Sequence, residues 1–167
     1  ESGAILQYLA RKTGQSYGAD ERARIQVDEW LFWQMAGLGP MAGQAHHFRQ
    51  YAPAMISDQR QLAYGAIRYS NEVHRLYGVL NKQLRGRDFI AGDYSIADMA
   101  AWGWTLPFAN QGIIIEEFPD LKAWQARIGE RPAVKRAMAQ ADAIKRIPLN
   151  APGAEDERKL LFGQRAR

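Results

Sequence analysis

The stretch that most constrains the fold runs from residue 92 to residue 104 and contains a helix-capping box. Ser95 is placed to be the N-cap and Asp98 follows three residues later, so each side chain can accept a hydrogen bond from the other residue's backbone N–H. The helix that begins there carries almost no other polar side chain. A helix that is apolar on every side is a buried helix, so we predict a domain wrapped around this central helix.

Helical spacing of apolar residues recurs along the chain, and no period-2 pattern predicts a strand. The strand-like run 113–115 is interpreted as a loop that plugs the core. The segment Gly37–Pro40 should kink or end the helix that precedes it. The fold class is therefore all-α, with helices expected from an N-cap at Ser2 and over residues 21–36, 41–51, 56–84, 96–104, 119–131 and 132–143.

The chain has 167 residues and no cysteine, which excludes both a disulfide framework and catalysis by a thiol of this chain. The lack of cysteine agrees with a reducing compartment, and we predict a cytoplasmic location. No apolar run is long enough to cross a bilayer, so a membrane is not an expected partner. The net charge of +4 is typical of a solvated surface, so a nucleic acid is not expected either.

Three other features could be functional but have simpler structural explanations. The five tryptophans fall on apolar helix faces, so core packing is favoured over base stacking. The adjacent His46 and His47 point about 100° apart on a helix, and no third ligand follows at a suitable spacing, so no metal site is predicted. Asp98 could be a catalytic acid, but its spacing from Ser95 explains it as a cap, and we assign it to folding.

The ordered motifs together resemble the glutathione transferase family over residues 1 to about 145. The opening Glu-Ser-Gly-Ala-Ile-Leu-Gln-Tyr-Leu resembles the segment at which the family's thioredoxin-like domain closes and its helical domain starts. Gly92–Ala100 resembles the buried capping-box motif, and Phe118–Trp124 resembles the helix after it. Residues 32–48, with Arg68-Tyr69 downstream, look like the bacterial nu-class, whose members are glutathione-dependent disulfide-bond oxidoreductases.

The resemblance implies a C-terminal helical domain over residues 1–147, followed by a linker and tail over residues 148–167. The thioredoxin-like domain is expected to be absent from this chain. Because that domain performs the chemistry in the family, we expect no catalytic residue here and no activity of the chain alone. The complete enzyme would be a homodimer in which a glutathione thiolate attacks a disulfide, with weak conjugation of glutathione to electrophiles.

The family also implies where glutathione binds. Glu1 and Ser2 match the pair that holds the γ-glutamyl group, and a helix N-terminus suits its carboxylate. Arg68 matches a nu-class arginine that contacts the glutathione carboxylates, either in the same subunit or from the neighbouring one, and a guanidinium can grip a carboxylate with two parallel bonds. Residues around the expected kink could line the substrate pocket or only pack between helices; they are Gln34, Gln44, His46, His47 and Tyr51.

A second class of function stays open. Helical domains of this type also occur without catalysis, as docking modules in translation factors and tRNA synthetases, so the chain could be a non-catalytic protein-interaction module. An in-frame βαβ segment encoded upstream would favour the enzyme, whereas a start codon at the boundary would favour the module.

Overall fold

The computed structural model describes residues 1–144 and 148–165, and within them the chain is built from helices. Extended backbone pairs in these ranges only at one isolated bridge, between Phe89 and Gly92, which confirms the all-α class. None of the described helices has the length and apolar character to span a membrane. The α-helices are α1 Ser2–Thr13, α2 Glu21–Trp33, α3 Gly39–His46, α4 Gln59–Leu84, α5 Ile96–Thr105, α6 Pro119–Gly129, α7 Pro132–Asp142 and α8 Glu155–Phe162.

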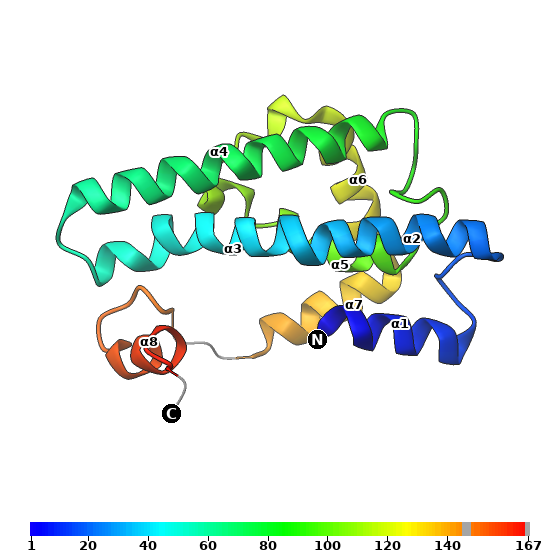
Figure 1. Cartoon of the computed structure of the whole chain (residues 1–167). Coiled ribbons are helices and arrows are strands. Elements are labelled where there is room, and N and C mark those ends of the chain that lie inside the picture. The colour runs from blue at the N-terminus through cyan, green and yellow to red at the C-terminus, as the bar shows by residue number, and fades with distance from the viewer. Residues whose placement is uncertain (145–147, 166–167) are drawn as a thin grey trace.

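The helices α2 and α3 form one continuous rod (Figure 1). We expected residues 37–40 to kink or end the helix, but the structure instead inserts a π-turn over Gln34–Leu38. In this turn the N–H of Gly39 donates to the carbonyl five residues back, and the wider turn accommodates Pro40, which has no N–H to donate. A second π-turn, His47–Tyr51, continues the rod beyond α3.

The long helix α4 lies alongside this rod and runs in the opposite direction (Figure 1). Its N-cap is Asp58, whose carboxylate accepts from the N–H of Arg60 at 3.0 Å. The helix α4 packs against α3 and α6. Each leucine that this packing fully buries contributes about 1.5–3 kcal/mol to the stability of the fold. Within the predicted helix 56–84, apolar residues recur at steps of three and four from Leu62 to Leu84, and most of them are buried, namely Leu62, Val73, Leu76, Leu80 and Leu84.

The predicted capping box forms at the start of α5. The Ser95 hydroxyl accepts from the N–H of Ala97 at 3.3 Å, and Asp98 Oδ2 accepts from the N–H of Ser95 at 3.0 Å. The other oxygen, Oδ1, accepts from the N–H of Ile90 at 3.0 Å and from the indole N–H of Trp124 at 2.8 Å. Burial raises the pKa of Asp98, while these hydrogen bonds act in the opposite direction. This carboxylate therefore joins α5 to the preceding loop and to α6.

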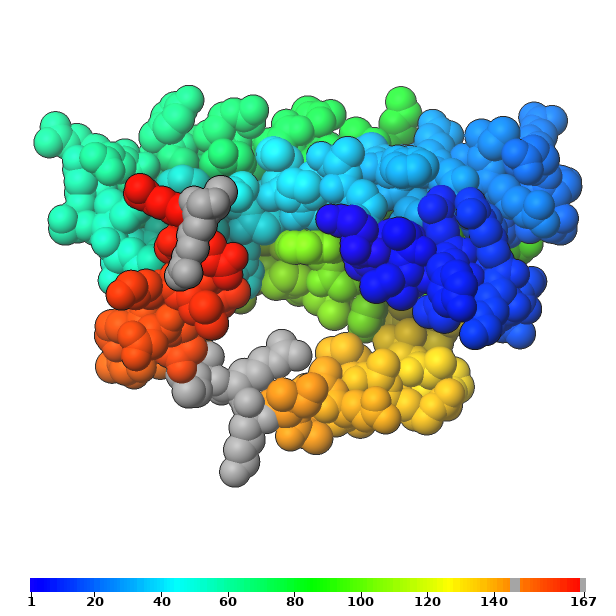
Figure 2. All heavy atoms as spheres, turned by 60° about the horizontal axis from the view of Figure 1, so that its bottom comes forward, coloured from blue at the N-terminus to red at the C-terminus, as the bar shows by residue number. Residues whose placement is uncertain are grey.

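The central helix is not buried on every side, which corrects our expectation. Met99, Gly103 and Trp104 are exposed. Figure 2 shows a hollow between α1 and α8 with the α5 region at its floor. Some of the apolar residues of α5 therefore lie on the surface of the protein. The buried positions of the helix are Ile96, Ala97, Asp98, Ala101 and Thr105.

The loop after α5 plugs the core, as predicted, with Ile113 and Ile115 buried. Next to it lies a buried polar network that the sequence pattern did not reveal. The Tyr77 hydroxyl donates to Gln111 Oε1 at 2.8 Å, and Gln111 Nε2 donates to the carbonyl of Trp104 at 2.8 Å. This network fixes the C-terminal end of α5.

The last described segment, residues 148–165, contains α8, which lies beside the end of the α2–α3 rod (Figure 1). Arg158 holds this segment together by donating to the carbonyls of Leu149 at 2.7 Å and Ala151 at 3.2 Å. The predicted domain boundary at residue 147 lies outside the described residues, so the division into domain and tail stays a prediction.

Candidate functional site

A groove of about 440 Å³ lies between α3 and the C-terminal end of α5. It is near the α8 side of the hollow in Figure 2, since the lining residue Tyr51 contacts Phe162 of α8. Of the five residues expected around the kink, His46 and Tyr51 belong to its wall. The lining is mainly apolar and aromatic and consists of Gly43, His46, Tyr51, Gly103, Trp104, Pro107 and Gln111.

Trp104 provides one wall of the groove and rests against two glycines of α3. A Cβ built on Gly39 would lie 3.3 Å from the indole Nε1, and one built on Gly43 would lie 3.5 Å from the ring carbon Cζ3. We predicted Trp104 to be a core residue, but 40% of it is exposed. Glycines four residues apart share one helix face, so the Gly39–Gly43 spacing is the sequence signal that could have identified the surface on which this indole packs.

Gln34 lies behind the groove rather than in its wall. It is 2% exposed, and its Oε1 has no hydrogen-bond partner among the described residues. The Nε2 atom of Gln34 and the Trp104 indole lie against the same side of Gly39. Leaving a buried polar atom without a partner costs about 1–3 kcal/mol, and π-turns such as this one are frequent at functional sites.

The N-terminus of α1 meets the same π-turn. Ser2 is the first residue of the helix and Glu1 is its N-cap, so the expected Ser2 cap was wrong, and neither side chain makes a capping hydrogen bond. Instead the Ser2 hydroxyl lies 3.8 Å from the sulfur of Met35. Because Met35 follows Gln34, the exposed start of α1 is adjacent to the turn that supports Trp104.

The structure does not bring the remaining predicted site residues together with Ser2. Arg68 is exposed on α4, which lies across the α2–α3 rod from α1 (Figure 1). Gln44 is exposed on α3 and lies outside the groove lining. His47 packs edge-on against Phe162, with ring centroids 4.7 Å apart.

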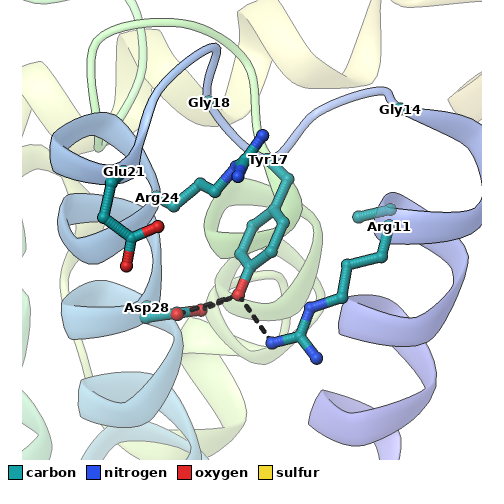
Figure 3. A pocket seen from close by; sticks show the side chains of 8 residues that line it. Arg11, Gly14, Tyr17, Gly18, Glu21, Arg24 and Asp28 are labelled. Atoms are coloured by element: carbon teal, nitrogen blue, oxygen red, sulfur yellow. Dashed lines mark hydrogen bonds between the residues drawn. The ribbon is translucent and has the colours of Figure 1, made fainter.

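A second hollow, of about 390 Å³, lies between α1 and α2 and was not predicted (Figure 3). The Tyr17 hydroxyl donates to the Asp28 carboxylate at 2.8 Å and accepts from Arg11 at 3.2 Å. Gln7 Nε2 donates to the same carboxylate at 2.8 Å. The side chains of Tyr17, Asp28, Arg11 and Gln7 are partners of one another, so this cluster joins α1 to α2, and we take the groove at Trp104 as the candidate site.

The adjacent histidines both contact Tyr51. The His46 and Tyr51 ring centroids are 5.0 Å apart, and His47 packs on Tyr51 at 6.2 Å and also on Phe162. Burial lowers the pKa of both imidazoles. Within residues 1–144 and 148–165, no cluster of three or more His, Cys, Asp or Glu side chains could hold a metal ion.

Acid is expected to destabilise the fold through these two histidines. Each histidine has a folded-state pKa below its unfolded value of about 6.5. Its contribution to the free energy of unfolding is therefore complete above that unfolded value and is lost as the pH falls through the folded-state pKa. The urea midpoint should therefore decrease when the pH is lowered from 7.5 to 5.5, and it should decrease less in a His46→Gln/His47→Gln double variant. An equal fall in both proteins would show that other groups cause it.

Comparison with known proteins identifies the family. A model described as the C-terminal domain of glutathione S-transferase matches residues 52–132. The disulfide-bond oxidoreductase YfcG of Escherichia coli K12 is 46% identical over 142 residues, covering 84% of this chain and 63% of YfcG. This chain belongs to the glutathione S-transferase family.

Two crystal structures from the transferase family have the same fold. A family member from Pseudomonas fluorescens Pf-5, with two glutathione bound, is 42% identical with a TM-score of 0.73, over 83% of this chain and 62% of its own. A glutathione transferase from Pseudomonas putida, with one glutathione disulfide bound per subunit, is 40% identical with a TM-score of 0.74, over 83% and 60%. The chain thus spans slightly less than two thirds of these relatives' length.

Proposed function

We propose that this chain is the helical part of a glutathione-dependent disulfide-bond oxidoreductase and binds its substrate in the hollow between α1 and α8. The observation that carries the proposal is the adjacency of a polar anchor and an apolar groove. Ser2 contacts Met35, and the neighbouring Gln34 lies at the glycine face on which Trp104 rests. The name of YfcG and the glutathione disulfide in the P. putida transferase support the same substrate class.

The two ends of the substrate would have different partners. The α1 N-terminus offers unpaired N–H groups and the Ser2 hydroxyl to the γ-glutamyl carboxylate, while the Glu1 carboxylate can pair with the ammonium. The groove at Trp104 would receive the group on the far side of the sulfur. A glutathione thiolate then attacks a disulfide sulfur, forming one S–S bond while the original S–S bond breaks and the other half leaves as a thiolate.

Arg68 would act in a homodimer. Because α4 and α1 lie on opposite sides of the rod in one chain, the Arg68 guanidinium is proposed to reach glutathione bound by a second copy. Tyr64 and Ile67, exposed beside it on α4, support an interface there, because large apolar side chains gathered on a surface mark contact sites.

Calorimetric titration of the full chain with glutathione tests these assignments. Ser2→Ala and Arg68→Ala should each weaken affinity by about tenfold, the effect of losing one hydrogen bond to a charged group. Arg60→Ala is the matched control, because Arg60 also lies on α4 and its side chain is 97% exposed. Affinity unchanged in both Ser2→Ala and Arg68→Ala would remove the proposed glutathione site.

A further inference from the structure

The helix α8 lies outside the residues that the family model matches, yet it contacts the groove wall. Phe162, at its C-terminal end, packs against Tyr51 with ring centroids 5.6 Å apart. The same ring packs edge-on against His47 at 4.7 Å. Tyr51 in turn packs on His46, and both Tyr51 and His46 line the groove. Phe162 is therefore separated by a single side chain, that of Tyr51, from the space that a ligand would occupy.

The segment that carries Phe162 is held in a defined shape. The Arg158 side chain is 10% exposed and donates to the carbonyl of Leu149 at 2.7 Å and to the carboxylate of Glu155 at 3.0 Å. The bonds to Leu149 and Ala151 tie the turn before α8 to the helix. Because the guanidinium uses several donors in a rigid fork, the shape of residues 149–158 is fixed, while the Phe162 ring makes the contact of α8 with Tyr51.

We propose that Phe162 is a specificity-determining residue that acts by positioning Tyr51, and that α8 thereby sets the size and apolar character of the substituent that the groove accepts. The proposal rests on the function proposed above for the groove. Tyr51 belongs to the second π-turn, and within the rod its ring contacts the rings of His46 and His47. Phe162 adds a contact from outside the rod and is not itself part of the groove lining.

The test is titration of the full chain with 8-anilinonaphthalene-1-sulfonate, an aromatic probe that contains no glutathione. Trp104→Ala removes the groove wall and defines the fluorescence that comes from the groove. Phe162→Ala should weaken this binding by about threefold to tenfold, the equivalent of one aromatic contact, whereas Phe162→Tyr should retain it. Leu160→Ala is the matched control, because Leu160 lies on α8 and is 68% exposed.

Catalysis by the complete enzyme, which includes the thioredoxin-like domain, provides a second readout that a purely structural role would not change. In Phe162→Ala, the KM for an aromatic disulfide should rise about threefold to tenfold, with little change in kcat or in the KM for bis(2-hydroxyethyl) disulfide. Probe binding that is the same in Phe162→Ala and Leu160→Ala would overturn the role of Phe162. Wild-type chain that binds the probe but not glutathione would instead overturn the proposed function, so the two failures are distinguishable.

Discussion

Replacing Asp98 with alanine is expected to lower the free energy of unfolding by about 3–5 kcal/mol. The buried carboxylate accepts four hydrogen bonds, three from N–H groups and one from the Ser95 hydroxyl at 3.3 Å, and all four disappear together. The variant would leave the N–H groups of Ile90 and Ser95 and the indole N–H of Trp124 without partners in a site from which water is excluded. Each such orphaned donor costs about 1–3 kcal/mol. A simple cap would account for only about 1 kcal/mol of this loss.

Asp20 offers the matched control for this prediction. It also caps a helix with its carboxylate, accepting from the N–H of Ala23 at 2.8 Å, but it is exposed. Asp20→Ala should therefore cost about 1 kcal/mol, since water can replace the lost bond. Urea unfolding followed by circular dichroism measures both variants. If Asp98→Ala unfolded like the wild type but abolished glutathione turnover in the complete enzyme, the carboxylate would have a chemical rather than a structural role.

Replacing Gly65 with alanine is expected to destabilise the protein by about 1–3 kcal/mol, although alanine is the better helix former. A Cβ at this buried position of α4 would lie 2.4 Å from the Phe48 ring carbons Cδ1 and Cε1. Phe48 has little freedom to move away, because it stacks on Tyr69 with ring centroids 5.5 Å apart and contacts the His47 ring. The clash therefore outweighs the gain in helix propensity.

A second glycine in the same helix should give the opposite result. A Cβ at Gly78 would meet Phe118 at 3.9 Å, which is an ordinary contact distance. Gly78→Ala should therefore stabilise the protein by about 0.5–1 kcal/mol, the usual gain for glycine in a helix interior. Urea midpoints of the two variants should lie on opposite sides of the wild-type value. Stabilisation by both would mean that Phe48 is free to rotate away from α4.

The helices were predictable because their signals are local. The Ser95–Asp98 box, the stripe from Leu62 to Leu84 and the capping pattern can each be found within a few turns of sequence. The contact between Asp98 and Trp124 joins residues 26 positions apart, and no periodicity encodes it. For the same reason the sequence indicated one cap at Asp98 but not its additional hydrogen bonds.

The groove was less predictable, because it depends on which side of a helix stays uncovered. The pattern of α5 gave no distinction between the buried Ala101 and the exposed Trp104, since both are apolar. A kink or a helix end was expected at Gly37–Pro40, whereas the chain forms a π-turn over Gln34–Leu38 and continues into α3, because residue propensities do not distinguish a helix end from a wider turn. The roles of Ser2 and Arg68 came from family resemblance and stay predictions.

The most direct test of the proposed site is an NMR titration of the full ¹⁵N-labelled chain with glutathione disulfide. We expect shifts at the backbone N–H of Ser2 and Tyr51 and at the indole N–H of Trp104, and none at the indole of Trp124, which is bonded to Asp98. Shifts confined to the hollow around Tyr17, or no shifts at saturating ligand, would contradict a glutathione site between α1 and α8.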